Sequence, residues 1–84
     1  MKENAKRNRD HTRIIFDIMS VIEKDVLRLT QIQGRTNLSW KLAKTTVTEL
    51  IKSNLIRMTP DNKYYLSPVG MDWLELYRKL YKEI

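Results

Sequence analysis

The sequence predicts a single, mostly helical α+β domain in which a β-hairpin lies between a set of short helices and a last helix. Three observations support this prediction. Apolar residues recur with the spacing of amphipathic helices in several segments. Two β-prone runs, residues 55–58 and 63–66, flank a cluster of turn residues. The length of 84 residues is enough for one domain with a modest hydrophobic core.

The first helix is predicted over residues 14–22. Its apolar residues recur at i, i+3, i+4 and i+7 and therefore share one face: Ile15, Ile18, Met19 and Ile22. Asp10 or Thr12 is expected to cap the start of this helix, because either side chain can accept a hydrogen bond from a backbone N–H. Asp25 and its charged neighbours should end the helix in a loop.

A short second helix is predicted from Gln31 to about Thr36. Thr30 and Gln33 have the spacing of a capping box, which makes Thr30 the expected N-cap. Gly34 within this helix costs about 1 kcal/mol relative to alanine. Close approach of another helix would explain why a glycine is tolerated there.

A tight turn and a third helix follow. The turn should contain a left-handed residue, a core residue and an N-cap, in the order Asn37, Leu38 and Ser39. The helix is predicted from Trp40 to about Ser53, with Asn54 as its left-handed stop, and its buried stripe comprises Ala43, Val47, Leu50 and Ile51. Two short helices joined by a three-residue turn are typical of the helix-turn-helix motif, whose second helix is the recognition helix.

The hairpin of residues 55–66 follows this recognition helix and is the expected wing. Ser67 and Pro68 then have the pattern of an N-cap followed by proline at the first helical position. The predicted fold is therefore a winged helix-turn-helix with a C-terminal helix. Its parts are a basic N-terminal arm at 1–12, the winged domain at 13–67 and a packing or dimerisation helix at 68–84.

The last helix has two apolar rows rather than one. The first row comprises Val69, Trp73, Leu76 and Leu80, and the second comprises Leu74, Tyr77, Tyr81 and Ile84. A surplus of apolar surface predicts a homodimer, with an interface formed by Trp73, Leu74, Tyr77, Leu80, Tyr81 and Ile84. The alternative is a single wide stripe that is buried entirely within the monomer.

The net charge of +6 is unevenly distributed. The arm and the middle of the chain carry the positive charge: the sums are +3 for residues 1–13, −2 for 14–25, +5 for 26–67 and zero for 68–84. A basic segment between neutral or acidic flanks is typical of a protein that binds a polyanion. A generic basic surface that promotes solubility is the alternative.

Double-stranded DNA is the polyanion that this arrangement favours. The outward face of the helix at 39–53 should enter the major groove with a basic, hydroxylic and aromatic set: Ser39, Trp40, Lys41, Lys44, Thr45 and Thr48. Further candidates are the wing residues Arg57, Asn62 and Lys63, the phosphate clamp Arg35, and the arm residues Lys6, Arg7 and Arg9. Trp40 could instead cover the core beside Leu38, and the other side chains could form an ordinary solvated surface.

Four stretches resemble a known family in order and spacing: IIFDIM at 14–19, NLSW at 37–40, LIKSNLI at 50–56 and YLSPVG at 65–70. Together they resemble the small archaeal winged helix-turn-helix DNA-binding proteins, of the crenarchaeal 10 kDa type. The resemblance implies DNA binding, dimerisation through the C-terminal helix and a role in transcription or chromatin. Asn54 replaces the usual glycine and Trp40 the usual tyrosine, and the last helix is shorter, which fits a plasmid or virus regulator better than a DNA packager.

Other classes of function have little support. The sequence has no glycine-rich phosphate loop, no histidine–carboxylate cluster and no paired nucleophile and base, so we expect no enzyme, cofactor or metal. It has no cysteine and no apolar run of membrane-spanning length, so we expect a cytoplasmic protein without a membrane partner. The predicted function is a DNA-binding transcriptional regulator. The alternatives are a nonspecific architectural DNA binder and a winged helix that binds another protein.

Overall fold

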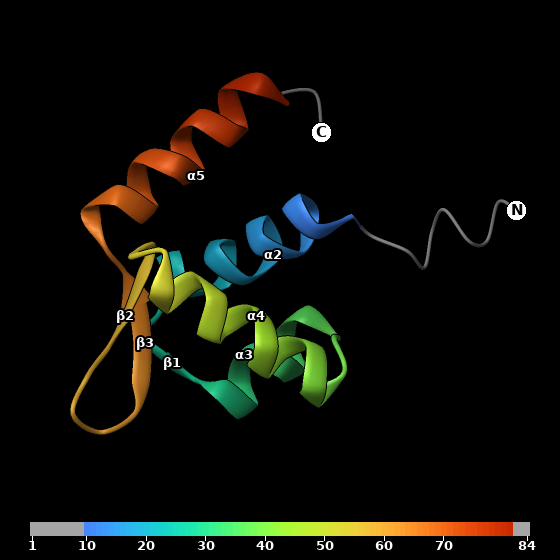
Figure 1. Ribbon diagram of the computed structural model, residues 1–84, viewed down its shortest axis with the longest axis vertical. Coiled ribbons are helices and arrows are strands. Elements are labelled where there is room, and N and C mark those ends of the chain that lie inside the picture. The colour runs from blue at the N-terminus through green and yellow to red at the C-terminus, as the bar shows by residue number, and fades with distance from the viewer. Residues whose placement is uncertain (1–9, 82–84) are drawn as a thin grey trace, which may run out of the picture.

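The computed structural model describes residues 10–81 (Figure 1). The elements follow in the order α2 (His11–Lys24), β1 (Leu27–Arg28), α3 (Leu29–Thr36), α4 (Trp40–Lys52), β2 (Ile56–Met58), β3 (Lys63–Leu66) and α5 (Pro68–Leu80). This order confirms the predicted α+β winged helix-turn-helix with a C-terminal helix. Helix α2 begins at His11, within the predicted arm of residues 1–12. Residues 1–9 of that arm, and Ile84 of the predicted interface, lie outside the described residues.

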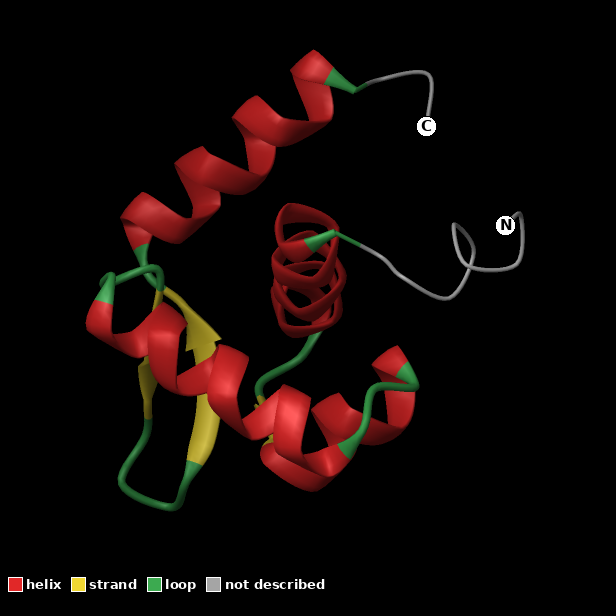
Figure 2. Ribbon diagram, turned by 45° about the vertical axis from the view of Figure 1, so that its right-hand side comes forward, coloured by secondary structure: helices red, strands yellow, loops and turns green. Residues whose placement is uncertain are grey.

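Helix α2 is the centre of the fold, with α5 on one side and α3 and α4 on the other (Figure 2). Ile18 and Met19 are fully buried, and Ile14 is buried where the sequence suggested Ile15, which is only partly buried. Of the two candidate caps, Asp10 is the one used, because its carboxylate accepts a hydrogen bond from the backbone N–H of Arg13 at 2.8 Å.

The three strands form an antiparallel sheet in the order β1-β3-β2. Strand β1 was not predicted. It has only two residues, and its pairing of Leu27 with Tyr64 and Arg28 with Lys63 joins segments far apart in the chain. The inner strand of the wing is thereby tied to the residue that precedes α3.

The start of α3 differs from the sequence-based expectation. The helix begins at Leu29, and the backbone N–H of Arg28 donates to the side chain of Gln31 at 3.0 Å. The prediction of Thr30 as N-cap was therefore wrong, since Thr30 lies inside the helix. The explanation for Gly34 was also wrong, because a Cβ placed there would meet nothing within 4 Å.

The turn before α4 and the stop after it are as predicted. Asn37 and Asn54 have left-handed backbone angles, with φ of 58° and 63°. Leu38 is buried, and the hydroxyl oxygen of Ser39 accepts a hydrogen bond from the N–H of Leu42 at 3.1 Å.

The buried face of α4 is rotated slightly from the predicted one. It comprises Ala43, Thr46, Val47 and Leu50. Ile51, which was expected in the stripe, is 39% exposed, so this prediction was wrong. Thr46 occupies the core side instead, because it lies one turn from both Ala43 and Leu50.

Helix α5 begins as predicted, with Ser67 as N-cap and Pro68 in the first turn. The Ser67 hydroxyl accepts from the N–H of Gly70 at 2.9 Å and donates to the carbonyl of Asn54 at 2.6 Å. A Cβ on Gly70 would lie 2.0 Å from the carbonyl oxygen of Leu55. The first turn of α5 therefore packs directly on the backbone that follows α4, and only glycine fits there.

The rest of α5 is held on α2 by an aromatic stack and an ion pair. The ring centroids of Phe16 and Tyr77 are 4.6 Å apart, and Trp73 lies against Tyr77 at 5.3 Å. The guanidinium of Arg78 donates two hydrogen bonds to the carboxylate of Glu23, at 2.8 and 3.1 Å. These bonds hold the pKa of the Glu23 carboxyl below its ordinary value and raise that of Arg78.

Candidate nucleic-acid interface

The outward face of α4 carries a row of polar side chains opposite the core. Lys41, Lys44, Thr45 and Thr48 are all exposed, and their spacing of three or four residues puts them on one side of the helix. The core contacts and the Ser39 cap hold this side of α4 outward. The Thr48 hydroxyl donates to the carbonyl of Lys44 at 2.9 Å, which leaves its oxygen as an acceptor.

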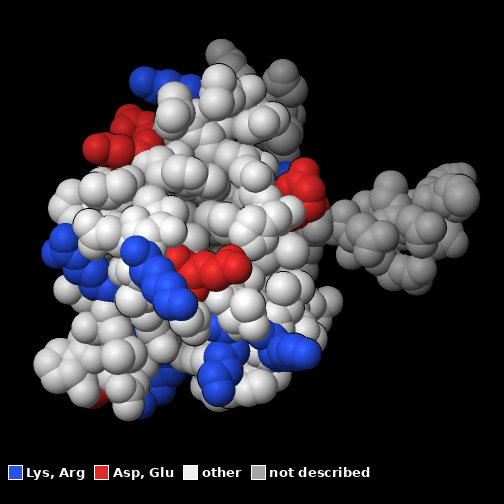
Figure 3. All heavy atoms as spheres, in the orientation of Figure 1, with Lys and Arg blue, Asp and Glu red and all other residues white. Residues whose placement is uncertain are grey.

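The charge on this face is available to a ligand. Lys41 and Lys44 make no ion pair with any residue between 10 and 81. Lys52, exposed and one turn beyond Thr48, extends the row; sequence reasoning missed it, although its spacing from Thr48 was a usable signal. Figure 3 shows several separate Lys and Arg side chains on the face on which α4 lies, with an acidic side chain among them.

One acidic residue interrupts this row. Glu49 lies one turn after Thr45, and its carboxylate is 3.2 Å from Nε2 of His11 at the start of α2. Both side chains are more than half exposed. The contact joins the first turn of α2 to the C-terminal half of α4.

Trp40 stands on a flank of α4, at its first helical position. Trp40 is 49% exposed. Half of the indole is accessible on the same flank as Lys44, one turn further on.

The wing is a tight hairpin whose turn is braced by hydrogen bonds. The N–H of Thr59 donates to the carbonyl of Lys63 at 2.7 Å, and the Thr59 hydroxyl donates to Asp61 at 2.6 Å. That hydroxyl bond is the main reason that the pKa of the Asp61 carboxyl lies below its ordinary value. Asn62 has a left-handed φ of 65°, so the structure gives it a role in forming the turn.

The cations of the wing differ in their surroundings. Arg57 is exposed and makes no ion pair within residues 10–81. Lys63 is partly buried, and its ammonium lies 3.9 Å from the Asp61 carboxylate. The Arg28 guanidinium donates to the carbonyl of Asp61 at 3.4 Å, which brings a cation from β1 to the same hairpin.

Arg35 lies in the last turn of α3. Its Nη1 is 3.4 Å from a carboxylate oxygen of Asp25, and both side chains are about half exposed or more. Such an exposed pair contributes little, typically under about 1 kcal/mol. The guanidinium can therefore exchange this carboxylate for a phosphate at small cost.

The two apolar rows of α5 have different surroundings. Leu74 and Tyr77, which the sequence placed in the dimer interface, are buried within the domain at 1% and 9% exposure, and only Tyr77 reaches the surface groove described below. The other row is largely exposed and comprises Val69, Leu76, Leu80 and the partly buried Trp73. Tyr81, from the end of the first-named row, is also exposed beside it. A shallow groove of about 170 Å³ runs along this row and reaches Thr12 of α2.

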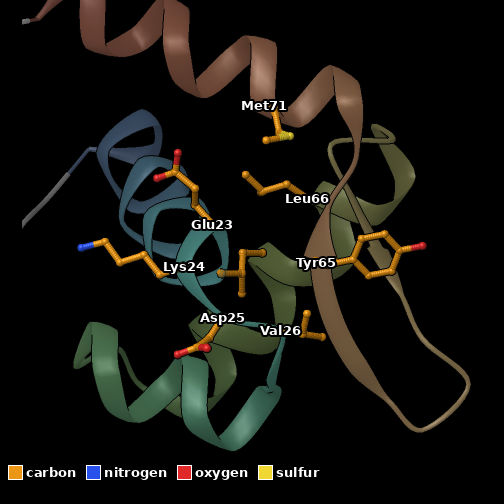
Figure 4. Close-up of a pocket in the computed structure, with 8 residues that line it drawn as sticks. Glu23, Lys24, Asp25, Val26, Tyr65, Leu66 and Met71 are labelled. Carbon is orange, nitrogen blue, oxygen red and sulfur yellow. The ribbon is translucent and has the colours of Figure 1, made fainter.

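A second groove lies away from the row on α4. It has a volume of about 210 Å³ between the end of α2, β3 and the start of α5. Figure 4 shows Met71 over Leu66, with Lys24 directed away. The carboxylates at its rim, Glu23 and Asp25, are paired with Arg78 and Arg35.

The described residues form neither a cluster of metal ligands nor a membrane-spanning helix. Between residues 10 and 81, no group of three or more metal-ligating side chains lies close enough together to hold an ion. Within the same range, every helix is too short or too polar to cross a bilayer.

Comparison with known proteins is consistent with this geometry. Residues 8–84 match a family described as winged helix-turn-helix. Over 76 residues the chain is 33% identical to an uncharacterised protein of Methanocaldococcus jannaschii, an alignment that covers 90% of this chain. The chain spans 36% of the length of that archaeal relative. The two matches confirm the resemblance to archaeal winged helix-turn-helix proteins.

Proposed function

Because this chain belongs to the winged helix-turn-helix family, whose fold is typical of non-enzymatic DNA-binding proteins, we propose that it is a regulator of transcription that binds double-stranded DNA. Helix α4 is the recognition helix and enters the major groove. The β2–β3 hairpin is the wing and contacts the backbone beside that groove.

The observation that supports this proposal is the outward row on α4, with lysines that have no ion pair among residues 10–81. Lysine can contact a phosphate or the acceptor edge of guanine, and threonine can bond a base edge or pack its methyl on thymine. The start of a helix adds partial positive charge, which favours a phosphate beside Ser39. Lys41, Lys44, Thr45 and Thr48 therefore provide both backbone positioning and base recognition.

The remaining candidate residues have supporting roles in this proposal. Arg35, Arg57 and Lys63 contact phosphates on either side of the groove, and Trp40 packs against a sugar of the backbone. Asn62 shapes the wing turn and lies at its end. These contacts position the protein on the duplex, while α4 determines which sequence is preferred.

We further propose that the protein acts as a homodimer through the exposed row of α5. Leu76 and Leu80 are 56% and 67% exposed, and large side chains of this kind are usually covered in an assembly when they form a row. A two-fold dimer predicts two recognition helices about 34 Å apart and a pseudo-palindromic binding site. Sedimentation equilibrium at micromolar concentration measures the mass, and a monomer would contradict this part of the proposal.

The DNA-binding proposal is tested by measuring affinity against salt concentration. Duplex sequences selected from a random pool provide the probe, and Lys41→Ala/Lys44→Ala is the variant. Loss of two phosphate contacts should reduce the slope of log affinity against log salt by about 1.8. The matched control is Lys24→Ala/Lys79→Ala, which removes the same charge from exposed positions on α2 and α5.

Three results would change the conclusion. If the two double variants have equal slopes of log affinity against log salt, α4 is not the recognition helix. Binding of unrelated duplexes within a few-fold of the selected sequence would favour an architectural protein. No binding of any duplex by the unmodified chain, together with a stable complex between α5 and another protein, would favour the protein-interaction alternative.

A further inference from the structure

The three strands place four side chains together on one face of the sheet. Residues paired across antiparallel strands have their side chains on the same face, and so do residues two apart along a strand. Arg28 pairs with Lys63, and Arg57 pairs with Tyr65. Because Lys63 and Tyr65 are two residues apart on β3, all four side chains share one face, which we call the outer sheet face.

Burial identifies the outer sheet face as the one turned away from the core. The opposite face carries apolar side chains that are buried in the core or packed against it: Leu27, Ile56, Tyr64 and Leu66. Figure 4 shows the side chains of Tyr65 and Leu66 on opposite sides of β3. On the outer sheet face the two arginines are exposed, and Lys63 and Tyr65 are partly buried.

The outer sheet face is positively charged. The strands and the wing turn, residues 27–28 and 56–66, contain three cations against one acid, Asp61, for a net charge of +2. The Asp61 carboxylate accepts a hydrogen bond from the Thr59 hydroxyl and lies 3.9 Å from the ammonium of Lys63. Arg28 and Arg57 form no ion pair with any residue from 10 to 81, so both guanidinium groups are available to an anionic ligand.

Tyr65 differs from the other tyrosines in its surroundings. Tyr64 packs against the core, and the rings of Tyr77 and Tyr81 lie 4.6 Å apart. Within residues 10–81, no ring stacks on Tyr65, no guanidinium lies over it, and its hydroxyl has no hydrogen-bond partner. The outer sheet face therefore presents a ring on a strand, between cations, with nothing in the described fold that uses it.

This combination of groups matches the chemistry of an unpaired nucleic-acid strand. Single strands are bound by cations that contact the phosphates, together with aromatic rings on which the bases stack. The two edge strands lie about 10 Å apart, so a base on Tyr65 would have its neighbouring phosphates within reach of Arg28 and Arg57. The bases of a duplex present only their edges, so a duplex would use the cations but not the ring.

We propose that the outer sheet face binds an unpaired strand of nucleic acid, with a base stacked on Tyr65 and phosphates held by the cations around it. The site is separate from the row on α4 that we assign to the duplex, and it does not rest on the proposed function. Arg28 and Tyr65 have no part in the duplex proposal, whereas Arg57 and Lys63 would contact phosphates of either ligand. The site tolerates different sequences, because every base has a face that can stack.

The first experiment separates the contribution of the bases from that of the phosphates. A short oligothymidylate is compared with an abasic oligonucleotide of the same length and charge, and fluorescence anisotropy measures the affinity of the unmodified chain for each. Stacking of one base on an aromatic side chain corresponds to about a 5- to 150-fold gain in affinity, so the oligothymidylate should bind more tightly by this factor. An oligouridylate of equal length then shows whether DNA or RNA is preferred.

The second experiment changes the ring. Tyr65→Ala should weaken binding of the oligothymidylate by about 5- to 150-fold and leave binding of the abasic strand unchanged. Tyr65→Phe should bind as the unmodified chain does, because stacking uses the ring and not the hydroxyl. Tyr81→Ala is the control, since it removes a tyrosine that already contacts Tyr77 on α5. Circular dichroism establishes that each variant is folded.

The third experiment changes the charge. Arg28→Gln removes one cation from the outer sheet face, and Lys79→Gln removes one from an exposed position on α5. Loss of one phosphate contact should reduce the slope of log affinity for the oligothymidylate against log salt by about 0.7 in the first variant only.

The outcomes distinguish this inference from the duplex proposal. Equal affinity of the unmodified chain for the oligothymidylate and the abasic strand would overturn the inference, even if Tyr65→Ala did not fold. Equal binding of the oligothymidylate by Tyr65→Ala and Tyr65→Phe, or equal slopes for Arg28→Gln and Lys79→Gln, would also overturn it. Tyr65→Ala should leave duplex affinity unchanged, so either proposal can fail while the other stands.

Discussion

Replacement of Gly70 by alanine tests how α5 is joined to the rest of the fold. An alanine Cβ at this position would lie 2.0 Å from the carbonyl oxygen of Leu55 and 3.0 Å from its carbonyl carbon. Both atoms belong to the backbone, so no change of side-chain rotamer can relieve the contact. Either the first turn of α5 or the segment after α4 must move.

The magnitude follows from opposing contributions. Alanine is favoured over glycine in a helix by about 1 kcal/mol. Overpacking in a tight contact costs about 1–3 kcal/mol. Movement of α5 also weakens the bonds from Ser67 to the carbonyls of Leu55 at 3.0 Å and Asn54 at 2.6 Å, each worth about 1 kcal/mol. We expect Gly70→Ala to lower the free energy of unfolding by about 3 kcal/mol, and Tm by more than about 10 °C.

Gly34→Ala is the matched control, because the same change occurs in a helix where the new Cβ meets nothing within 4 Å. Gly34 has no positive φ, so alanine should stabilise the protein by about 0.5–1 kcal/mol. Urea denaturation followed by circular dichroism measures both changes. A Gly70→Ala variant as stable as the unmodified protein, or a Gly34→Ala variant destabilised to the same extent, would refute this reasoning.

Two further predictions concern α5. The Arg78 guanidinium keeps the pKa of Glu23 below its ordinary value, so the pair stabilises the fold above that value, and this contribution is lost as pH falls through the lowered pKa. Glu23→Gln should therefore lower the free energy of unfolding by under about 1 kcal/mol at neutral pH. It should also make the free energy of unfolding less dependent on pH in the acid range. Denaturation curves at several pH values that parallel those of the unmodified protein would contradict this. Leu76→Glu should give a monomer by sedimentation that is still folded by circular dichroism. The control Lys79→Glu, on the same helix, should leave the sedimentation mass unchanged. Equal masses for the two variants would count against the α5 interface.

Features set by local chemistry could be predicted from the sequence. The caps at Ser39 and Ser67 and the left-handed stops at Asn37 and Asn54 depend on bonds and angles within a few residues. Each was located correctly for that reason. The outward row of α4 followed from the same helical spacing, once its apolar side was assigned to the core.

Features set by distant parts of the chain could not be predicted. Strand β1 exists because Leu27 and Arg28 meet β3, more than thirty residues later, and their own sequence carries no strand pattern. Helix α3 begins at Leu29, directly after Arg28 of β1, so its N-cap is Arg28 and not Thr30. The sequence alone did not indicate which apolar row of α5 would meet α2. That choice depends on contacts between the two helices, namely the stack of Phe16 on Tyr77 and the pair of Arg78 with Glu23.

The positions of the two tryptophans give the protein two separate optical reporters. Trp40 is half exposed on α4, whereas Trp73 lies in the aromatic stack of α5. Indole emission depends on contact with water and on nearby rings, so each residue responds to a different event. With Trp73 replaced by phenylalanine, fluorescence would follow occupation of the α4 face, and with Trp40 replaced it would follow the docking of the last helix, in both cases without an attached dye.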